Sequence, residues 1–418
     1  MFPVLTPFKS PAYVWLWWSN TFSSSGRWAL VLILSLQILQ TTHSSFWVGL
    51  GLFLTQGPVI LLAPISGVLA DRFDRRTLNV MSAAFAGVTT GLLALTTWLG
   101  VLTLPLELAL SLAYGVAFVF QLTLRSTLVP SIVPPAQLVS AVSLFQVGTQ
   151  GAQFLGPALA TPLLVRGGPA LGWLFCTGLY VASALASIPV GSARARTAIG
   201  NPTGVLQESF RYLYARPLVW TAIWAVSLHC ALTMAYQGML PMFVTTDLRA
   251  PDSSYGALLT SIGLGAALGS LGLARLSAPR FRPALFATSL VGSGISLAVM
   301  AATSSVTVAI ASGFFVGATQ AVFMSMALAL IQGSVDDEFR GRATSVYQMI
   351  TMAPMAIFGW GMGGLADITE PRPLMIVSGI GFVVVMAIFL FASTWLRALF
   401  GVRAWVSGSQ PITVPALT

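Results

Sequence analysis

Twelve long apolar segments run along this chain and alternate with short polar connections that hold most of its charged residues. A helix needs about 20 mostly apolar residues to cross the hydrocarbon core of a bilayer, and a soluble domain has no place for so many segments of this length. Charged residues make up only 7% of the chain, so polar side chains are too few to cover a folded surface in water. We therefore expect an all-α integral membrane protein with twelve transmembrane helices.

Charges, Pro and Gly clusters and runs of Ser and Thr bound the expected helices. The first span is expected to remain in the protein, because it is far longer than a signal-peptide core and further spans follow at once. The predicted spans are 12–38, 46–68, 78–101, 104–126, 140–165, 169–190, 218–243, 255–275, 284–302, 305–331, 345–367 and 373–397.

The positions of Lys and Arg predict which side of the membrane each connection faces. If the chain alternates sides, 16 of these 20 residues lie on one side, 3 lie on the other, and Arg27 lies inside a helix. Basic residues concentrate in cytoplasmic loops, so we expect a multi-pass protein of the inner cell membrane with both termini in the cytoplasm. The net charge of +9 is then mostly a topology signal and does not indicate a nucleic-acid partner.

The longest polar interruption divides the chain into two six-helix halves. We expect an N-terminal half at 1–190, a cytoplasmic linker at 191–217, a C-terminal half at 218–400 and a cytoplasmic tail at 401–418. The halves share short patterns at an offset of 202 residues, such as 141–146 against 343–348, which favours a parallel duplication of one unit. Within the linker, 205–215 is either a short amphipathic helix at the membrane surface or a plain connection.

No catalytic or metal-binding constellation is found in the sequence. Cys176 and Cys230 lie in apolar runs, and together with His43 and His229 they form no recognisable metal-ligand pattern. The chain has no Gly-Lys-Ser/Thr phosphate loop and no Ser-His-Asp set at one depth in the membrane. We therefore expect neither an enzyme nor a bound cofactor, and ATP hydrolysis by this chain is not expected to drive it.

The most specific motif is Gly67-Val68-Leu69-Ala70-Asp71-Arg72-Phe73-Asp74-Arg75-Arg76, between the second and third spans. It resembles the loop signature of the major facilitator superfamily, with Asp74 in place of a second Gly. The resemblance implies a transporter fold in two halves and a loop that acts as a latch favouring one of two access states. Gly67 is expected to let two helices approach closely, and Asp71 to accept from backbone amides or an Arg. The implied latch residues are Gly67, Asp71, Arg72, Arg75 and Arg76, although the arginines alone are better explained as cytoplasmic anchors.

Shorter sequence segments indicate a particular branch of this superfamily. The segments 134–138 (PPAQL) and 340–343 (RGRA) resemble the bacterial exporter branch that includes enterobactin and macrolide exporters. The fifth span partly matches the antiporter signature of the superfamily, with Gly148, Gly151, Gly156 and Pro157 present but Ala160 and Thr161 in place of the closing glycines. Pro157 predicts a kink and Gly156 predicts close packing where the halves meet, while an ordinary kinked helix explains the same residues.

Polar and aromatic side chains near mid-depth are the candidates for a substrate cavity. Arg27 lies about halfway along the first span, where a charge marks a functional site by default; it either binds an anionic group of a substrate or forms a structural bond to Gln56. Histidine is the side chain that ordinarily titrates near neutral pH, and His229 is related to Arg27 by the repeat offset, although a lone His is more often a packed residue. The candidates are Asn20, Ser24, Arg27, Gln56, Gln150, Gln153, His229, Tyr236, Gln237, Gln320 and Phe323.

Together these features favour a secondary active transporter that exports amphipathic small molecules, drug-like or siderophore-like, by alternating access. Arg27 favours neutral or anionic substrates, and because no Asp or Glu lies mid-helix, a proton route is expected only through His229. The expected partners are the small-molecule substrate, membrane lipids and, for coupling, protons; the oligomeric state is left open. Two alternatives are a transport-inactive sensor or scaffold that kept the fold and a flippase for a lipid-like substrate.

Overall fold

The computed structural model describes residues 3–134, 137–191, 202–275, 281–336 and 339–399, and these residues form helices and connections without a β-strand. The first half contains η1 (Pro3–Lys9), α1 (Pro11–Thr42), α2 (Ser45–Gln56), α3 (Pro58–Arg72), α4 (Arg75–Trp98), α5 (Leu104–Ile132) and α6 (Leu138–Ser187). A short helix, α7 (Pro202–Tyr214), precedes the second half. The second half contains α8 (Pro217–Thr233), η3 (Ala235–Gly238), α9 (Leu240–Met242), η4 (Phe243–Asp247), α10 (Asp252–Arg275), α11 (Arg282–Ala302), α12 (Val306–Gly333), α13 (Arg340–Thr369), α14 (Pro371–Ala392) and α15 (Thr394–Leu399).

Among the described residues, 11 helices are long and apolar enough to cross a membrane. The long helix α6 contains two of the twelve predicted spans, because its backbone leaves helical geometry at Gly168, with φ 70° and ψ −175°. Glycine has no Cβ and adopts this positive φ at little cost, so the chain can reverse direction there. The fold is therefore that of twelve transmembrane helices.

Two predicted spans are interrupted in the structure. The span predicted at 46–68 is divided into α2 and α3 at Gly57, because Pro58 has no N–H to continue the helix hydrogen bonds. The span predicted at 218–243 ends as an α-helix at Thr233 and continues as the short elements η3, α9 and η4. Such irregular backbone at membrane depth is tolerated where it is covered by protein or lines a cavity.

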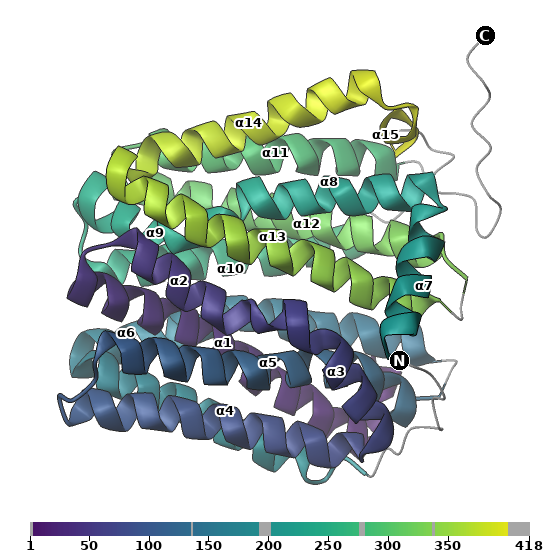
Figure 1. The fold of residues 1–418 in the computed structure, drawn as a ribbon, viewed down its shortest axis with the longest axis horizontal. Coiled ribbons are helices and arrows are strands. Elements are labelled where there is room, and N and C mark those ends of the chain that lie inside the picture. Colours follow the sequence, from purple (N-terminus) through teal and green to yellow (C-terminus); the bar gives the residue numbers. More distant parts are fainter. Residues whose placement is uncertain (1–2, 135–136, 192–201, 276–280, 337–338, 400–418) are drawn as a thin grey trace.

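The helices lie roughly side by side in two bundles, as Figure 1 shows, with α2 to α5 in purple and blue on one side and α11, α13 and α14 in green and yellow on the other. Large apolar side chains cover much of the outside; Phe391, for example, is 83% exposed and Ile368 is 82% exposed. Such a surface suits lipid tails and does not suit water.

The two halves approach most closely where glycines lie opposite one another. A Cβ at Gly49 of α2 would lie 2.9 Å from the carbonyl oxygen of Gly359 of α13, and one at Gly238 of η3 would lie 3.2 Å from Cα of Gly49. On the other side of the bundle, a Cβ at Gly263 of α10 would overlap the backbone of Gln153 in α6. These small residues let the halves pack backbone to backbone.

The linker region is described only from residue 202 onward, so 192–201 and the predicted tail at 401–418 lie outside the described residues. Helix α7 covers most of the segment predicted at 205–215. Tyr212 holds it to the connection between α12 and α13: its hydroxyl donates to Asp336 at 2.6 Å and its ring stacks on Phe339 with centroids 3.9 Å apart. Arg216 adds an ion pair to Asp336 at 2.8 Å.

Candidate transport site

The ends of the halves that are predicted to lie outside are closed against one another. Asp367, in the last turn of α13, accepts hydrogen bonds from the backbone N–H of Ser45 at 2.6 Å and of Phe46 at 3.2 Å, at the start of α2. Gln40 of α1 donates to Asp252 at the start of α10, at 2.6 Å. Both contacts join the first half to the second, so this side has no open path between them along these helices.

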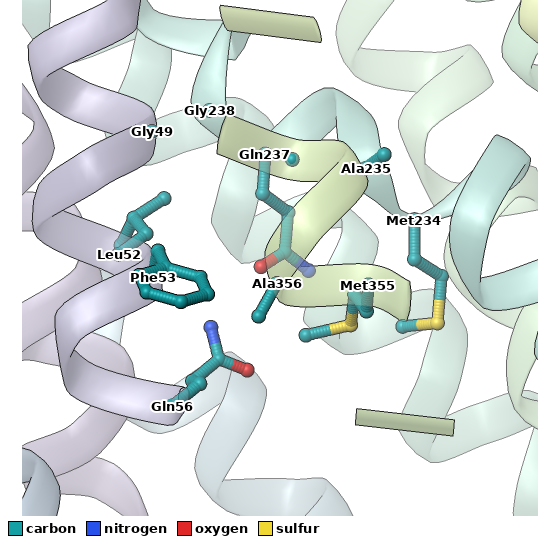
Figure 2. Close-up of a pocket in the computed structure, with 11 residues that line it drawn as sticks. Gly49, Leu52, Phe53, Gln56, Met234, Ala235, Gln237, Gly238, Met355 and Ala356 are labelled. Atoms are coloured by element: carbon teal, nitrogen blue, oxygen red, sulfur yellow. The ribbon is translucent and has the colours of Figure 1, made fainter. Parts of the chain in front are cut away.

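Deeper in the bundle, a cavity of about 20 Å³ lies where the two halves meet. A volume of this size holds about one water molecule. Figure 2 shows its walls, which come from α2, from the interrupted segment after α8 and from α13. The lining residues are Gly49, Leu52, Phe53, Gln56, Met234, Ala235, Gln237, Gly238, Met355, Ala356 and Gly359. The cavity is thus apolar except for two amide side chains, one from each half.

Arg27 does not line this cavity but lies directly behind it. Its Nη2 donates to Oε1 of Gln56 at 3.2 Å, and its guanidinium lies 4.8 Å from the ring of Phe118 and 5.2 Å from that of Trp28. The structure thus contains the bond between Arg27 and Gln56 that was expected as one of two alternatives. Of the predicted cavity residues, Gln56 and Gln237 line the cavity and Arg27 contacts it through Gln56.

Other predicted residues lie within the first half. The amide of Asn20 donates to Oγ1 of Thr149 at 2.9 Å and ties α1 to α6. Ser24 is buried beside Asn20 on α1. Gln150 and Gln153 are partly buried on α6, and the backbone of Gln153 faces Gly263. None of these four lines the cavity described above.

His229 lies inside the second half rather than at the cavity. It is fully buried, its Nδ1 lies 2.8 Å from Oγ1 of Thr233, and its ring lies 4.6 Å from Phe323 and 5.2 Å from Phe382. The hydroxyl of Thr233 also donates to the carbonyl oxygen of His229 at 2.8 Å. This is the packed arrangement that is commoner for a lone His, and Phe323 belongs to the same aromatic cluster.

Gln320 and Tyr236 stabilise the interruption of the helix after α8. Nε2 of Gln320 donates to the carbonyl oxygen of Thr233 at 2.6 Å, which satisfies a backbone group that the broken helix leaves free. Tyr236 is 2% exposed within η3, beside the lining residue Gln237. Neither Gln320 nor Tyr236 lines the cavity itself.

The predicted latch loop joins α3 to α4 at the opposite end of the bundle. Asp74, which replaces a glycine of the superfamily signature, accepts from the N–H of Thr77 at 3.0 Å and so caps α4. Nε of Arg75 donates to the carbonyl oxygen of Ala70 at 3.2 Å. Arg72 ends α3 and is exposed, Arg76 lies in the first turn of α4, and the side chain of Asp71 is outside the described part.

One expectation for this loop is wrong in the observed conformation. Gly67 was expected to permit a close helix approach, but a Cβ at Gly67 would meet no atom within 4 Å. The same holds for Gly272 near the corresponding end of α10. The close contacts between the halves lie instead toward the other ends of the helices, at Gly49 and Gly238, where the bundle is closed.

The expectation for Gly156 also needs a correction. A Cβ at Gly156 would lie 2.9 Å from Cβ of Trp28 in α1, so this glycine packs within the first half and not between the halves. Pro157 is buried within α6, whose dihedral angles leave the helical range only at Gly168. The halves instead meet at Thr161 and Gln153, against Gly256 and Gly263 of α10.

The structure adds residues that the sequence did not single out. In the sequence Asp367 and Asp252 are two of 11 acidic residues, and Gly49, Gly238 and Gly359 are three of 39 glycines without a distinguishing spacing. No signal in a single sequence shows which residue of the other half each one faces. Among the described residues no group of three or more His, Cys, Asp and Glu is placed to hold a metal ion, and both cysteines are free and buried.

Two six-helix halves that meet at a cavity and close at one end are the architecture of a membrane transporter of the major facilitator type. The chain belongs to the family described as transmembrane secretion effector (MFS_3), whose model matches residues 3–398. The family and fold are those of transporters and not of enzymes.

Among similar proteins are the enterobactin exporters EntS. That of Salmonella choleraesuis is 25% identical over 370 residues, which cover 86% of this chain and 87% of the relative. That of Shigella boydii is 25% identical over 368 residues, which cover 86% of each.

Solved structures share the fold. A bacterial homolog of the human lysosomal transporter Spinster, in an inward-facing conformation, superposes with a TM-score of 0.69 at 15% identity, over 96% of this chain and 98% of that one. The nucleoside transporter NupG, as a mutant, gives a TM-score of 0.75 at 13% identity, over 93% of this chain and 100% of that one.

Proposed function

We propose that this transporter exports amphipathic small molecules from the cytoplasm by alternating access, through the cavity between α2, the segment after α8 and α13. The observation that carries the proposal is the lining of that cavity, which is apolar except for the amides of Gln56 and Gln237. Apolar walls with a few polar groups are typical of sites for amphipathic ligands, and the methionines Met234 and Met355 adapt to varied shapes. The similarity to enterobactin exporters supports export as the direction.

In the proposed cycle, the observed conformation is a state in which the outer side is closed. The ends that are predicted to lie outside are closed, and the cavity measures about 20 Å³, so it cannot hold an amphipathic molecule without a movement of the halves. Separation at the cytoplasmic ends admits the substrate, and separation at Gly49, Gly238 and Gly359 releases it outside. We also propose that the loop around Asp71 acts as the latch for the cytoplasmic side and that both termini are cytoplasmic.

Flux in reconstituted vesicles tests the proposal. Purified protein is expected to move an amphipathic fluorescent compound across the membrane faster than empty vesicles do, and a pH gradient of either sign shows whether protons take part. The variant Gly49→Val introduces a side chain 2.9 Å from the backbone of Gly359 and Trp360, so it should keep the outer ends apart and abolish flux. The matched control is Gly361→Val, where a Cβ meets no atom within 4 Å and flux should remain.

Two other functions lead to different results. A transport-inactive sensor or scaffold shows no flux of any compound and retains a protein partner at its cytoplasmic surface. A flippase moves a labelled phospholipid between leaflets and leaves soluble amphipathic compounds where they are. Either result contradicts the proposed export of small molecules, provided that the purified protein and its Gly361→Val control are both folded.

A further inference from the structure

We infer that Arg27 fixes the orientation of the Gln56 amide, so that the cavity always presents a hydrogen-bond donor and selects compounds that carry an acceptor or an anionic group. This inference rests on the proposed function, because it names the substrate class of the same cavity. It assigns the selection of substrates to Gln56, which lines the cavity. Arg27 is a positioning residue that acts through its hydrogen bond to Gln56.

The chemistry of the Arg27 contact decides which way the amide points. A guanidinium has five N–H donors and no acceptor, so only the oxygen of the Gln56 amide can face it. The distance from Nη2 of Arg27 to Oε1 of Gln56 is 3.2 Å, within hydrogen-bond range. The amide nitrogen of Gln56 must therefore point away from Arg27.

That nitrogen faces the cavity and is free to bind a ligand. Gln56 lines the cavity, and its Nε2 has no hydrogen-bond partner among the residues that the structure describes. A rotation of the amide by half a turn would place two donors against the guanidinium in a water-poor setting, which is unfavourable. The donor is therefore permanent as long as Arg27 is present.

The opposite wall lacks such a constraint. The side chain of Gln237 lines the cavity from the second half, and among the described residues no charged side chain bonds its amide. Its amide can present either its oxygen or its nitrogen to a ligand. The lining residues include no Asp or Glu, so a cation finds no opposite charge in these walls. Gln56 thus sets the polarity of the site, and Gln237 adapts to it.

Binding of three compounds on closely related aromatic frames tests the inference in detergent-purified protein. The first, 2-phenylindole, offers only an N–H donor; the second, 2-phenylquinoline, offers only an acceptor; the third, 2-phenylquinoline-4-carboxylate, adds an anionic group. We expect dissociation constants for the quinoline at least five times lower than for the indole, and lower again for the carboxylate. The neutral pair separates hydrogen-bond polarity from net charge.

Two variants assign the preference to the residues named. In Arg27→Gln the amide of Gln56 is free to turn, so the preference for 2-phenylquinoline over 2-phenylindole should fall below twofold. In Gln56→Glu the carboxylate keeps a partner for Arg27 and replaces the donor by acceptors, so the preference for the carboxylate compound should fall at least tenfold. The control Gln237→Leu should weaken all three compounds alike and keep their order.

The outcomes separate this inference from the proposed function. A wild-type protein that binds the indole as tightly as the quinoline, or that binds none of the three, overturns the inference, as does an unchanged order in both variants. The vesicle assay decides the proposed function independently. If the protein transports but the two variants bind the three compounds in the wild-type order, only the role of Gln56 is refuted. If the variants change that order but the protein shows no flux, only the proposed transport is refuted.

Discussion

The carboxylate of Asp367 accepts the backbone N–H of Ser45 at a distance of 2.6 Å, although the two residues belong to opposite halves of the protein. The same carboxylate accepts the N–H of Phe46 at 3.2 Å and the hydroxyl of Ser44 at 2.5 Å. These N–H groups belong to the first turn of α2, where a helix leaves its donors free and favours negative charge. One side chain therefore caps a helix of the other half, and this cap has to open whenever the outer side opens.

The substitution Asp367→Asn should shift the protein toward an outward-open state. An uncharged amide accepts fewer of these bonds and more weakly, and hydrogen bonds to a charged group contribute about 1.5–3 kcal/mol. A membrane-impermeant thiol reagent added outside should label Leu52→Cys about tenfold faster or more, in a background without Cys176 and Cys230. The control is Glu370→Gln, an exposed acid close by in the chain, which should leave labelling unchanged; equal labelling in both variants would mean that Asp367 does not hold the gate.

Asp71→Asn should act in the opposite direction if the loop between α3 and α4 is the latch of the cytoplasmic side. Loss of a charge at the end of α3 should favour the inward-open state without unfolding the protein. Labelling of Leu52→Cys from the cytoplasmic side should rise, and the double variant Asp71→Asn with Asp367→Asn should return toward the wild-type balance. Labelling that does not change from either side would leave this loop as a membrane anchor.

Gly317→Ala should destabilise the second half. A Cβ at Gly317 of α12 would overlap the carbonyl group of Ile262 in α10, and backbone cannot move aside as a side chain can. Overpacking of this kind costs about 1–3 kcal/mol, which outweighs the gain of about 1 kcal/mol that Ala usually brings over Gly in a helix. The apparent melting temperature in detergent should therefore fall. At Gly361, where a Cβ meets no atom within 4 Å, the same substitution should leave it unchanged or higher.

The attachment of α7 should depend on pH in the acid range. The Tyr212 hydroxyl that donates to Asp336, together with Arg216, holds the pKa of this carboxyl below its usual value. A lowered pKa in the folded state means that the contribution is fully present above about pH 4 and is lost as the pH falls through the folded pKa. A spin label at Glu208 should therefore stay immobile at neutral pH and become mobile only in strong acid. In Tyr212→Phe this change should begin at a higher pH; a label that is already mobile at pH 7 in the unaltered protein would contradict the assignment.

The predicted topology can be checked with reporter fusions. Thr103 lies in the connection between α4 and α5, and Ser192 lies just after the sixth span. Because these connections are separated by an odd number of helices, a reporter active only in the periplasm should respond at Thr103, and one active only in the cytoplasm should respond at Ser192. The same response at both positions would exclude the alternating twelve-helix path.

Much of the fold follows from local features that a single sequence displays. The twelve apolar segments are visible because each helix has to satisfy its own backbone hydrogen bonds in lipid, so every span must be long and continuous in sequence. Asp71 and its neighbours form a contiguous motif, and Arg27 is conspicuous as a charge within an apolar run. Even the contact between Arg27 and Gln56 was among the alternatives, because an unpaired charge in a membrane needs a nearby polar partner.

The features that only the tertiary structure decided are those that join residues of different halves. Asp367 meets Ser45, and Gly49 meets both Gly359 and Gly238, through the packing of segments more than 100 residues apart, which no local pattern encodes. Packing within the second half likewise decided the surroundings of His229, whose repeat position matches that of Arg27 but whose neighbours Phe323 and Phe382 enclose it in an aromatic cluster. A sequence determines which side chains are present and which segments must be helices in lipid. Which of those side chains reach the cavity depends on how helices rotate and cross, and this is set by the fit of many surfaces at once.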